Sequence, residues 1–165
     1  MNHRTSFGDP RLKEMYSLYL RESVDIKGGD LDLLKDKAKE LGIRVIIGVA
    51  ERVNHSIYCA AVHIDPKGEI INVHRKLMPS FGERLVWSIG DGHGLRAFDA
   101  EKNFKISALN CWENWLPLAR ASLYGQGNIC ARQGREEGSI PLKNFVPLSH
   151  ERKYSIQTKP PVTLV

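Results

Sequence analysis

Long apolar runs, cysteine pairs and internal repeats are all missing from this 165-residue chain. No apolar run approaches the roughly 20 residues that a membrane-spanning helix needs, so we expect no membrane segment. Residues 1–10 are polar, and we expect no cleaved signal peptide. The three cysteines form no CxxC pair, which favours a reduced, cytoplasmic setting over a disulfide framework. The absence of repeats argues against a solenoid.

A strong excess of charge of one sign is also lacking. The chain has 24 Lys and Arg residues against 19 Asp and Glu residues, a net charge of +5, and residues 128–165 carry +3 of it. No basic run is interleaved with aromatic residues, as a nucleic-acid-binding surface would require. We therefore expect no nucleic-acid partner, and a basic nucleic-acid-binding protein is the weakest of the alternatives. The 42% hydrophobic and 26% charged content is that of an ordinary globular domain.

The hydrophobic pattern that is present predicts a mixed α/β domain rather than a regular βαβ repeat. The expected helices cover about 11–22 and 31–41, with Asp30 as the N-cap of the second, and a third starts near Pro117. Short β-branched runs predict strands at 43–51, 57–64, 69–74 and 104–110. The segment 74–95 is long, irregular and rich in glycine and aromatics, and such a segment inside a compact domain is usually functional.

Cys111 directly follows the strand expected at 104–110 and precedes the helix expected from Pro117. The N-terminus of a helix offers unpaired backbone N–H groups and a positive dipole end. Both stabilise a thiolate and a developing oxyanion. The position therefore favours a nucleophilic cysteine over an inert buried one.

Three short motifs occur in a fixed order: HRKL at 74–77, ERLVWSIGDG at 83–92 and CWEN at 111–114. All three tryptophans of the chain lie in or directly beside these motifs. Together the motifs resemble the nitrilase branch of the carbon–nitrogen hydrolase superfamily, and the resemblance covers about residues 9–127. Each motif alone is a modest signal, whereas the three in this order are specific.

The resemblance implies an α/β fold of the nitrilase-type αββα sandwich, of which this chain would supply the incomplete, central portion. It implies Cys111 as the nucleophile, Lys76 as the group that stabilises intermediates and Glu83 as the second glutamate. Trp112, Glu113 and Asn114 would support the site. No organic cofactor and no metal are implied. The implied partners are a small-molecule nitrile and further copies of the same chain in a homo-oligomer.

The sequence also departs from the family pattern. Ser107 and Ser88 stand where the family usually has glycine, which leaves every reacting group in place. The family's general-base glutamate lies in an FPE-type segment that does not occur in this sequence. After Gly127 the resemblance stops, so we expect 1–127 to be a partial hydrolase domain and 128–165 a poorly structured tail. A truncation or frameshift explains this better than a compact variant does.

The implied reaction converts a nitrile to a carboxylic acid and ammonia through a cysteine thioimidate and an acyl-enzyme. Two alternatives stay open: cyanide or nitrile hydration that stops at the amide, and a catalytically inactive truncated remnant that serves as an interaction module.

The remaining candidate residues are expected to have no catalytic role. Glu51 is expected to be a local ion-pair partner rather than a substitute base. Cys59 and Cys130 are expected to be non-catalytic. A zinc site built from Cys59, His63 and His74 lacks the ligand spacing of a zinc knuckle. The GDGHG loop at 90–94 does not open a helix after a strand, so it is not a dinucleotide-binding motif.

Overall fold

The computed structural model describes residues 9–101, 104–127 and 130–133 of the chain. Its helices are α1 (Pro10–Glu22), α2 (Asp32–Leu41) and α3 (Pro117–Gly125), with two short 3₁₀ helices, η1 (Phe81–Leu85) and η2 (Cys111–Trp115). Its strands are β1 (Val45–Val53), β2 (Ser56–Ile64), β3 (Ile70–Arg75), β4 (Phe98–Glu101), β5 (Phe104–Leu109) and β6 (Cys130–Gln133).

The first sheet is an antiparallel meander in the order β1-β2-β3. The turn between β2 and β3 is closed by the Asp65 carboxylate, which accepts the backbone N–H groups of Lys67 and Glu69 at 2.8 and 2.9 Å. One face of this sheet packs against α2 through a buried apolar cluster: Leu31, Ala38, Val62 and Ile64. Because strand side chains alternate between faces, His63 points to the opposite face of β2.

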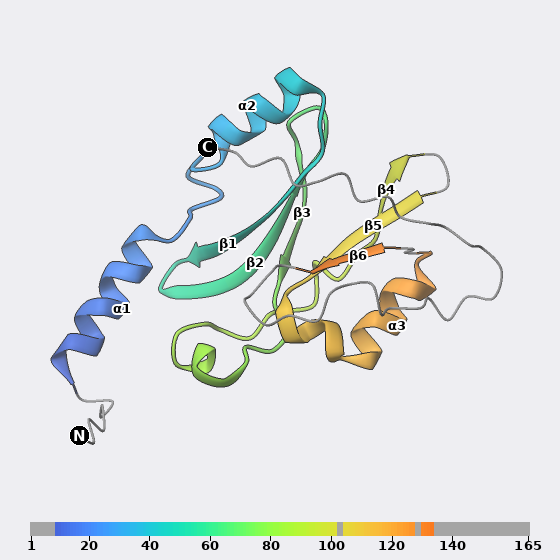
Figure 1. Cartoon of the computed structure of the whole chain (residues 1–165). Helices are drawn as coiled ribbons and strands as arrows, with labels where there is room; N and C mark the ends of the chain where they lie inside the picture. The colour runs from blue at the N-terminus through green and yellow to red at the C-terminus, as the bar shows by residue number, and fades with distance from the viewer. Residues whose placement is uncertain (1–8, 102–103, 128–129, 134–165) are drawn as a thin grey trace.

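The second sheet has the order β4-β5-β6, with β5 antiparallel to β4 and parallel to β6. The ring of His63 in the first sheet lies 5.5 Å from the ring of Phe98 in β4, so the two sheets face each other. Helix α3 lies beside the second sheet, with Ala119 and Leu123 buried. The layers therefore follow the order α2, first sheet, second sheet, α3 (Figure 1).

The predicted helices and strands are confirmed, with ends displaced by one or two residues. The predicted cap is wrong: Leu31, not Asp30, is the N-cap of α2, and no side chain caps it. The Asp30 carboxylate instead accepts the backbone N–H of Asp25 at 2.7 Å. Asp30 therefore closes the Gly28–Gly29 loop, a local competition that the sequence pattern does not reveal.

The expected poorly structured tail needs one correction. Residues 130–133 form β6 and pair with β5, because the apolar end of β5 offers an open strand edge. Residues 134–165 lie outside the described residues, as do 128–129. Within the described ranges, no helix has the length and apolar content needed to cross a membrane.

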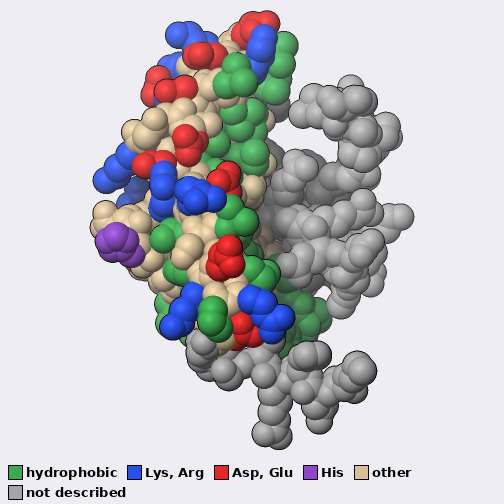
Figure 2. Space-filling view, turned by 90° about the vertical axis from the view of Figure 1, so that its left-hand side faces the viewer, with side chains coloured by type: hydrophobic (Ala, Val, Ile, Leu, Met, Phe, Trp, Pro, Cys, Tyr) green, Lys and Arg blue, Asp and Glu red, His purple; other side chains and the backbone are tan. Residues whose placement is uncertain are grey.

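The outer face of the molecule beside α1 and α2 shows charges of both signs. Figure 2 shows Lys and Arg side chains interspersed with Asp and Glu side chains over this face. Within α2, Lys35 forms an ion pair with Asp32, and Lys37 forms one with Glu40. This face therefore presents no continuous positive patch.

Candidate active site

The end of β3 directs two basic side chains towards the second sheet. His74 and Lys76 are two residues apart, so strand alternation places them on the same face. Lys76 is 1% exposed, and its Nζ donates to Oε2 of Glu83 at 2.7 Å. A lysine ammonium is this deeply buried in proteins only when a carboxylate or similar group pairs with it. Lys76 is thus an interior charge rather than a surface one.

The turn that carries Glu83 is the 3₁₀ helix η1. Ser80 is its N-cap, and a capping box joins Ser80 to Glu83. Oε2 of Glu83 accepts the backbone N–H of Ser80 at 2.6 Å as well as the lysine. Phe81, the first residue of η1, has a φ of 45°, which is uncommon for a residue with a Cβ atom. The capping box therefore fixes the carboxylate that neutralises Lys76.

The turn that carries Cys111 is the 3₁₀ helix η2, and it is built in the same way. Asn110 is the N-cap, and a capping box joins it to Glu113. Cys111, the first residue of η2, has a φ of 51°. The Asn114 side chain donates to the carbonyl oxygens of Cys111 and Leu109 at 2.9 and 3.2 Å. These bonds hold the cysteine backbone in its left-handed conformation, which costs roughly 1–2 kcal/mol.

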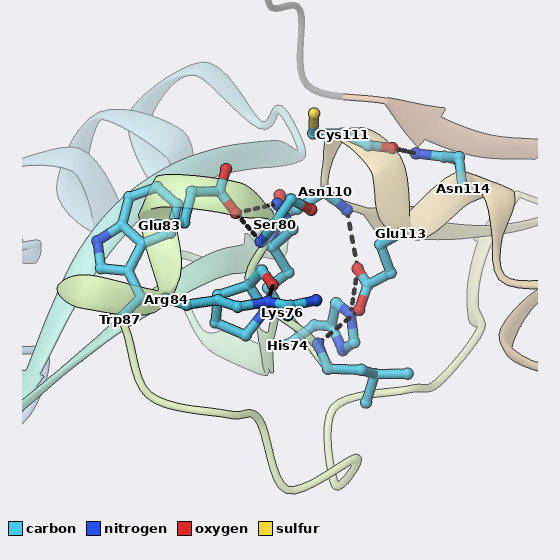
Figure 3. Close-up of polar contacts among 12 residues, drawn as sticks. His74, Lys76, Ser80, Glu83, Arg84, Trp87, Asn110, Cys111, Glu113 and Asn114 are labelled. Carbon is cyan, nitrogen blue, oxygen red and sulfur yellow. Dashed lines mark hydrogen bonds and ion pairs between the residues drawn. The ribbon is translucent and has the colours of Figure 1, made fainter.

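The two turns lie next to each other. The rings of Phe81 and Trp112 meet edge to face, with centroids 5.5 Å apart. Figure 3 shows Cys111 on one side of this region and the Lys76–Glu83 pair on the other, with Asn110 between them. The fold therefore brings together the segments that carry all three predicted catalytic residues, although they are up to 35 positions apart in the sequence.

A hollow of about 390 Å³ opens between the two turns. Its lining is mostly apolar and comes from both turns and the segments beside them: Met78, Pro79, Ser80, Phe81, Arg84, Trp112, Glu113, Trp115 and Leu116. A hollow with apolar walls and few polar groups is the usual form of a small-molecule site. Lys76, Glu83 and Cys111 do not line this hollow, which lies beside them and not at them.

The GDGHG loop supports the end of β3 from behind. A Cβ atom on Gly90 would lie 2.4 Å from the carbonyl oxygen of Arg75, and one on Gly94 would lie 2.2 Å from that of Val73. The backbone N–H of Gly90 donates to the carbonyl of Lys76 at 2.9 Å. Only glycine permits so close an approach. The loop therefore holds the backbone of β3 and of Lys76 in place.

Arg75 lies on the opposite face of β3 from Lys76. Its guanidinium forms a bidentate ion pair with Glu51 at 2.7 and 2.8 Å and also contacts Asp91 at 3.0 Å. The hydrogen bond to Glu51 raises the pKa of Arg75 above its ordinary value. The carboxyl pKa of Asp91 is lowered, first by the backbone N–H of His93 and further by Arg75. Glu51 is thus an ion-pair partner, as predicted.

Two parts of the predicted site differ from the structure. Cys111 does not lie at the N-terminus of an α-helix: η2 and Leu116 separate it from α3, because Pro117 starts that helix. The pairing of His74 with Glu113, at 2.9 Å between Nε2 and Oε2, was missed. The capping-box spacing of Asn110 and Glu113 could have indicated the bond between those two residues, but no sequence signal pointed to His74.

Cys59 and the second buried histidine, His63, lie on β2, the strand that pairs with β3. Cys59 is a thiol in the middle of β2, and its carbonyl accepts the backbone N–H of Lys76 at 2.7 Å. The side chain of Cys130 lies outside the described residues. His63 is fully buried between the sheets, and its burial lowers its pKa to about 4, with His74 and Arg44 adding to the effect. Among the described residues, neither ring nitrogen of His63 has a hydrogen-bond partner.

Known proteins share both this fold and this sequence pattern. The sequence model of the family described as carbon-nitrogen hydrolase matches residues 14–134. The chain belongs to the carbon–nitrogen hydrolase family. The match extends past the expected boundary at Gly127 and includes β6. It therefore extends the hydrolase-like part of the chain through the second sheet.

Curated relatives of this carbon–nitrogen hydrolase include plant, bacterial and fungal enzymes. It is 37% identical over 124 residues to a bifunctional nitrilase/nitrile hydratase of Oryza sativa subsp. japonica, covering 74% of this chain and 34% of that one. A nitrilase of Bradyrhizobium diazoefficiens is 36% identical over 118 residues, with 72% and 36% covered. The chain thus spans about a third of the length of these relatives.

Solved structures show the same fold. A carbon-nitrogen hydrolase from Helicobacter pylori G27 matches with a TM-score of 0.58 at 20% identity, covering 76% of this chain and 40% of that one. The NitN amidase from Nesterenkonia matches with a TM-score of 0.58 at 15% identity, covering 71% and 46%. At these identities the likeness concerns the fold alone, an incomplete αββα arrangement in the part that aligns.

Proposed function

We propose that this protein is a nitrilase-type carbon–nitrogen hydrolase in which Cys111 attacks the substrate carbon. One observation carries the proposal: the strained Cys111 turn lies beside a buried Lys76–Glu83 ion pair. A residue held at positive φ by two side-chain hydrogen bonds is typical of a functional position. The family membership and the nitrilase names of the relatives support the same chemistry.

The residue types suit a thioimidate mechanism. The Cys111 sulfur adds to the nitrile carbon, and the thiol proton goes to the nitrile nitrogen, which gives a neutral thioimidate. Water then adds to that carbon, ammonia leaves, and a thioester remains. A second water releases the carboxylic acid and the thiol. The Lys76 ammonium would stabilise the negative charge that develops in the tetrahedral species, and Glu83 would hold the ammonium in place.

Nitrile hydration is a second candidate, because the tetrahedral intermediate can also expel the thiol and leave an amide. The observation that favours it is the name of the rice relative, a bifunctional nitrilase/nitrile hydratase. The two outcomes differ only in which group leaves. Measuring acid and amide from the same reaction separates them.

Trapping the covalent intermediate tests the nucleophile directly. The 165-residue chain is incubated with benzonitrile, digested and mapped by mass spectrometry. We expect the peptide that contains Cys111 to gain the full mass of one nitrile, since the thiol adds without losing an atom. Cys59→Ala should keep the adduct and Cys111→Ala should lose it. An adduct on Cys59 alone, or none on folded protein, contradicts the proposal.

Turnover is a separate expectation. We expect ammonia release by this 165-residue chain to equal that of its Cys111→Ala variant. Both carboxylates at the site are occupied, since Glu83 binds Lys76 and Glu113 accepts bonds on both oxygens. A positioned base is typically worth about 10²–10⁴ in rate. Robust ammonia release that Cys111→Ala abolishes would instead show that a carboxylate of this chain, Glu83 first among them, can serve as the base.

Assembly and location are also proposals. Helix α3 and the turn before it expose Trp115 (58%), Leu118 (85%) and Tyr124 (39%). A group of exposed apolar side chains often marks a surface that binds another protein. We therefore propose a homo-oligomer that buries this surface, in the reduced, cytoplasmic setting that the cysteine pattern favours.

A further inference from the structure

We propose that Glu113 is a positioning residue that fixes the Cys111 turn against the end of β3, and so sets where the thiol lies relative to Lys76. This inference rests on the proposed function, because it takes Cys111 and Lys76 to act together. Glu113 itself is not assigned a catalytic step.

The Glu113 carboxylate joins the end of β3 to the Cys111 turn. Its Oε1 accepts the backbone N–H of Leu77, the residue after Lys76, at 2.7 Å. Its Oε2 accepts the backbone N–H of Asn110, the residue before Cys111, at 2.9 Å. The same Oε2 lies 2.9 Å from Nε2 of His74. A carboxylate therefore connects the neighbour of the lysine directly to the neighbour of the cysteine (Figure 3).

Local capping does not account for this arrangement. The capping box of η2 explains only the bond to Asn110. Leu77 and His74 precede Glu113 by 36 and 39 residues; His74 lies in β3 of the other sheet, and Leu77 lies two residues after the end of that strand. The Glu113 side chain is fully buried, and hydrogen bonds to an ionised acceptor in such surroundings are roughly twice as strong as neutral ones. The carboxylate thus links the two turns more rigidly than apolar packing would.

The chemistry of the donors requires a carboxylate at this position. Both backbone N–H groups point at oxygen atoms, and a glutamine amide offers only one oxygen. In Glu113→Gln, the amide N–H₂ group must face the N–H of either Leu77 or Asn110. One of the two connections is therefore lost, and the Cys111 turn moves relative to Lys76.

The test compares Glu113→Gln with Glu51→Gln. Both wild-type glutamates are buried, 2% and 5% exposed, and both accept two or more hydrogen bonds. Glu51 pairs with Arg75 on the opposite face of the first sheet, so its loss reproduces the cost of removing a buried carboxylate without touching the cysteine turn. The readout is the rate of Cys111 alkylation by iodoacetamide as a function of pH, located by mass mapping.

We expect Glu113→Gln to slow alkylation of Cys111 near neutral pH by at least about tenfold, because displacing a reacting group by 1 Å can cost on the order of 100-fold. The midpoint of its pH profile should move upward, since the thiolate loses the nearby ammonium. Glu51→Gln should stay within about twofold of wild type at both readouts. A rate and midpoint in Glu113→Gln that match those of Glu51→Gln overturn the inference.

Two further readouts separate the possible failures. Faster alkylation of Cys59 than of Cys111 in the wild-type chain contradicts the proposed function itself. If Glu113→Gln does not fold by circular dichroism, hydrogen exchange on the wild-type chain decides the inference. The Leu77 and Asn110 amide protons should exchange as slowly as those within β2, and fast exchange at either amide overturns the inference.

Discussion

The two 3₁₀ turns of the site are built in the same way but carry different side chains. Each begins with a residue of positive φ and carries a capping-box glutamate that reaches a basic side chain of the β3 end. Phe81 occupies the first position of η1, whereas Cys111 occupies that of η2. The Glu83 side chain is 19% exposed and binds a lysine, whereas the Glu113 side chain is fully buried and binds a histidine.

The difference shows how one local design serves two purposes. A partly exposed carboxylate beside an ammonium remains accessible to substrate and water. A fully buried carboxylate whose oxygens both accept bonds has no freedom to move a proton, and it suits a fixed support. The two glutamates therefore differ in exposure and in partner, although the two turns that carry them are built alike.

The largest expected effect separates the two glutamates by stability. Glu83→Gln leaves the buried Lys76 ammonium without a counter-charge, and breaking a buried pair in this way costs about 3–5 kcal/mol of unfolding free energy. Glu113→Gln removes a hydrogen-bond acceptor from two backbone N–H groups without stranding a buried lysine, and should cost about 1–3 kcal/mol. Urea unfolding of both variants measures the difference. An equal loss in both would show that the two turns have the same energetics.

The second prediction extends the comparison to the buried histidines. His74 is paired with Glu113, whereas burial lowers the pKa of His63 to about 4. The unfolded chain takes up a proton on His63 near pH 6.5 and the folded protein near pH 4. His63 therefore leaves the unfolding free energy unchanged above pH 6.5. Between pH 6.5 and 4 its contribution lowers the unfolding free energy by about 3 kcal/mol in total, and below pH 4 that contribution is constant.

The measurement is the pH dependence of the unfolding free energy in wild type and His63→Leu. The variant should lose this part of the acid sensitivity while keeping the part that other groups contribute. Arg44 and His74, which both disfavour a charged His63, stay in place in both proteins. Parallel curves from pH 7 to 4 would mean that His63 titrates normally in the fold.

A third, smaller effect concerns two glycines of the same irregular segment. Gly94→Ala places a Cβ atom 2.2 Å from a backbone oxygen of β3, and such overpacking costs about 1–3 kcal/mol. Gly82 lies inside η1, where an added Cβ meets nothing within 4 Å. Gly82→Ala should be neutral or stabilising by about 0.4–1 kcal/mol, through the unfolded state. Thermal unfolding of both variants checks this. Equal melting temperatures would show that the loop at 90–94 shifts to accommodate the added Cβ atom.

The smallest effect on folding belongs to the surface beyond η2. Leu118→Glu changes a side chain that is 85% exposed, so the unfolding free energy should change by no more than about 0.5 kcal/mol. Its effect on association should nevertheless be clear in light scattering. We expect wild type above the 18.6 kDa monomer mass and Leu118→Glu shifted towards it. A wild-type monomer across a wide concentration range contradicts the proposed oligomer.

Much of the fold could be predicted from the sequence because its elements carry strong local signals. The β-branched runs of β1 and β2 and the glycine after α2 set these elements within two residues. The three catalytic candidates could be placed through their motifs. The pairing of His74 with Glu113 and the burial of Lys76 could not, since both depend on how two sheets face each other. The predicted N-cap of α2 was wrong because the Asp30 carboxylate accepts the backbone N–H of Asp25 instead.

Adjacent basic residues at the end of β3 make the length of the preceding hairpin turn critical. Arg75 belongs to the face with Glu51, and Lys76 belongs to the face with Glu83. Inserting or deleting one residue in the turn at 65–68 would tend to exchange the two faces. A guanidinium would then enter the space of an ammonium, and two carboxylates would lose their partners together. The length of this turn is therefore constrained in addition to the Asp65 side chain that closes it.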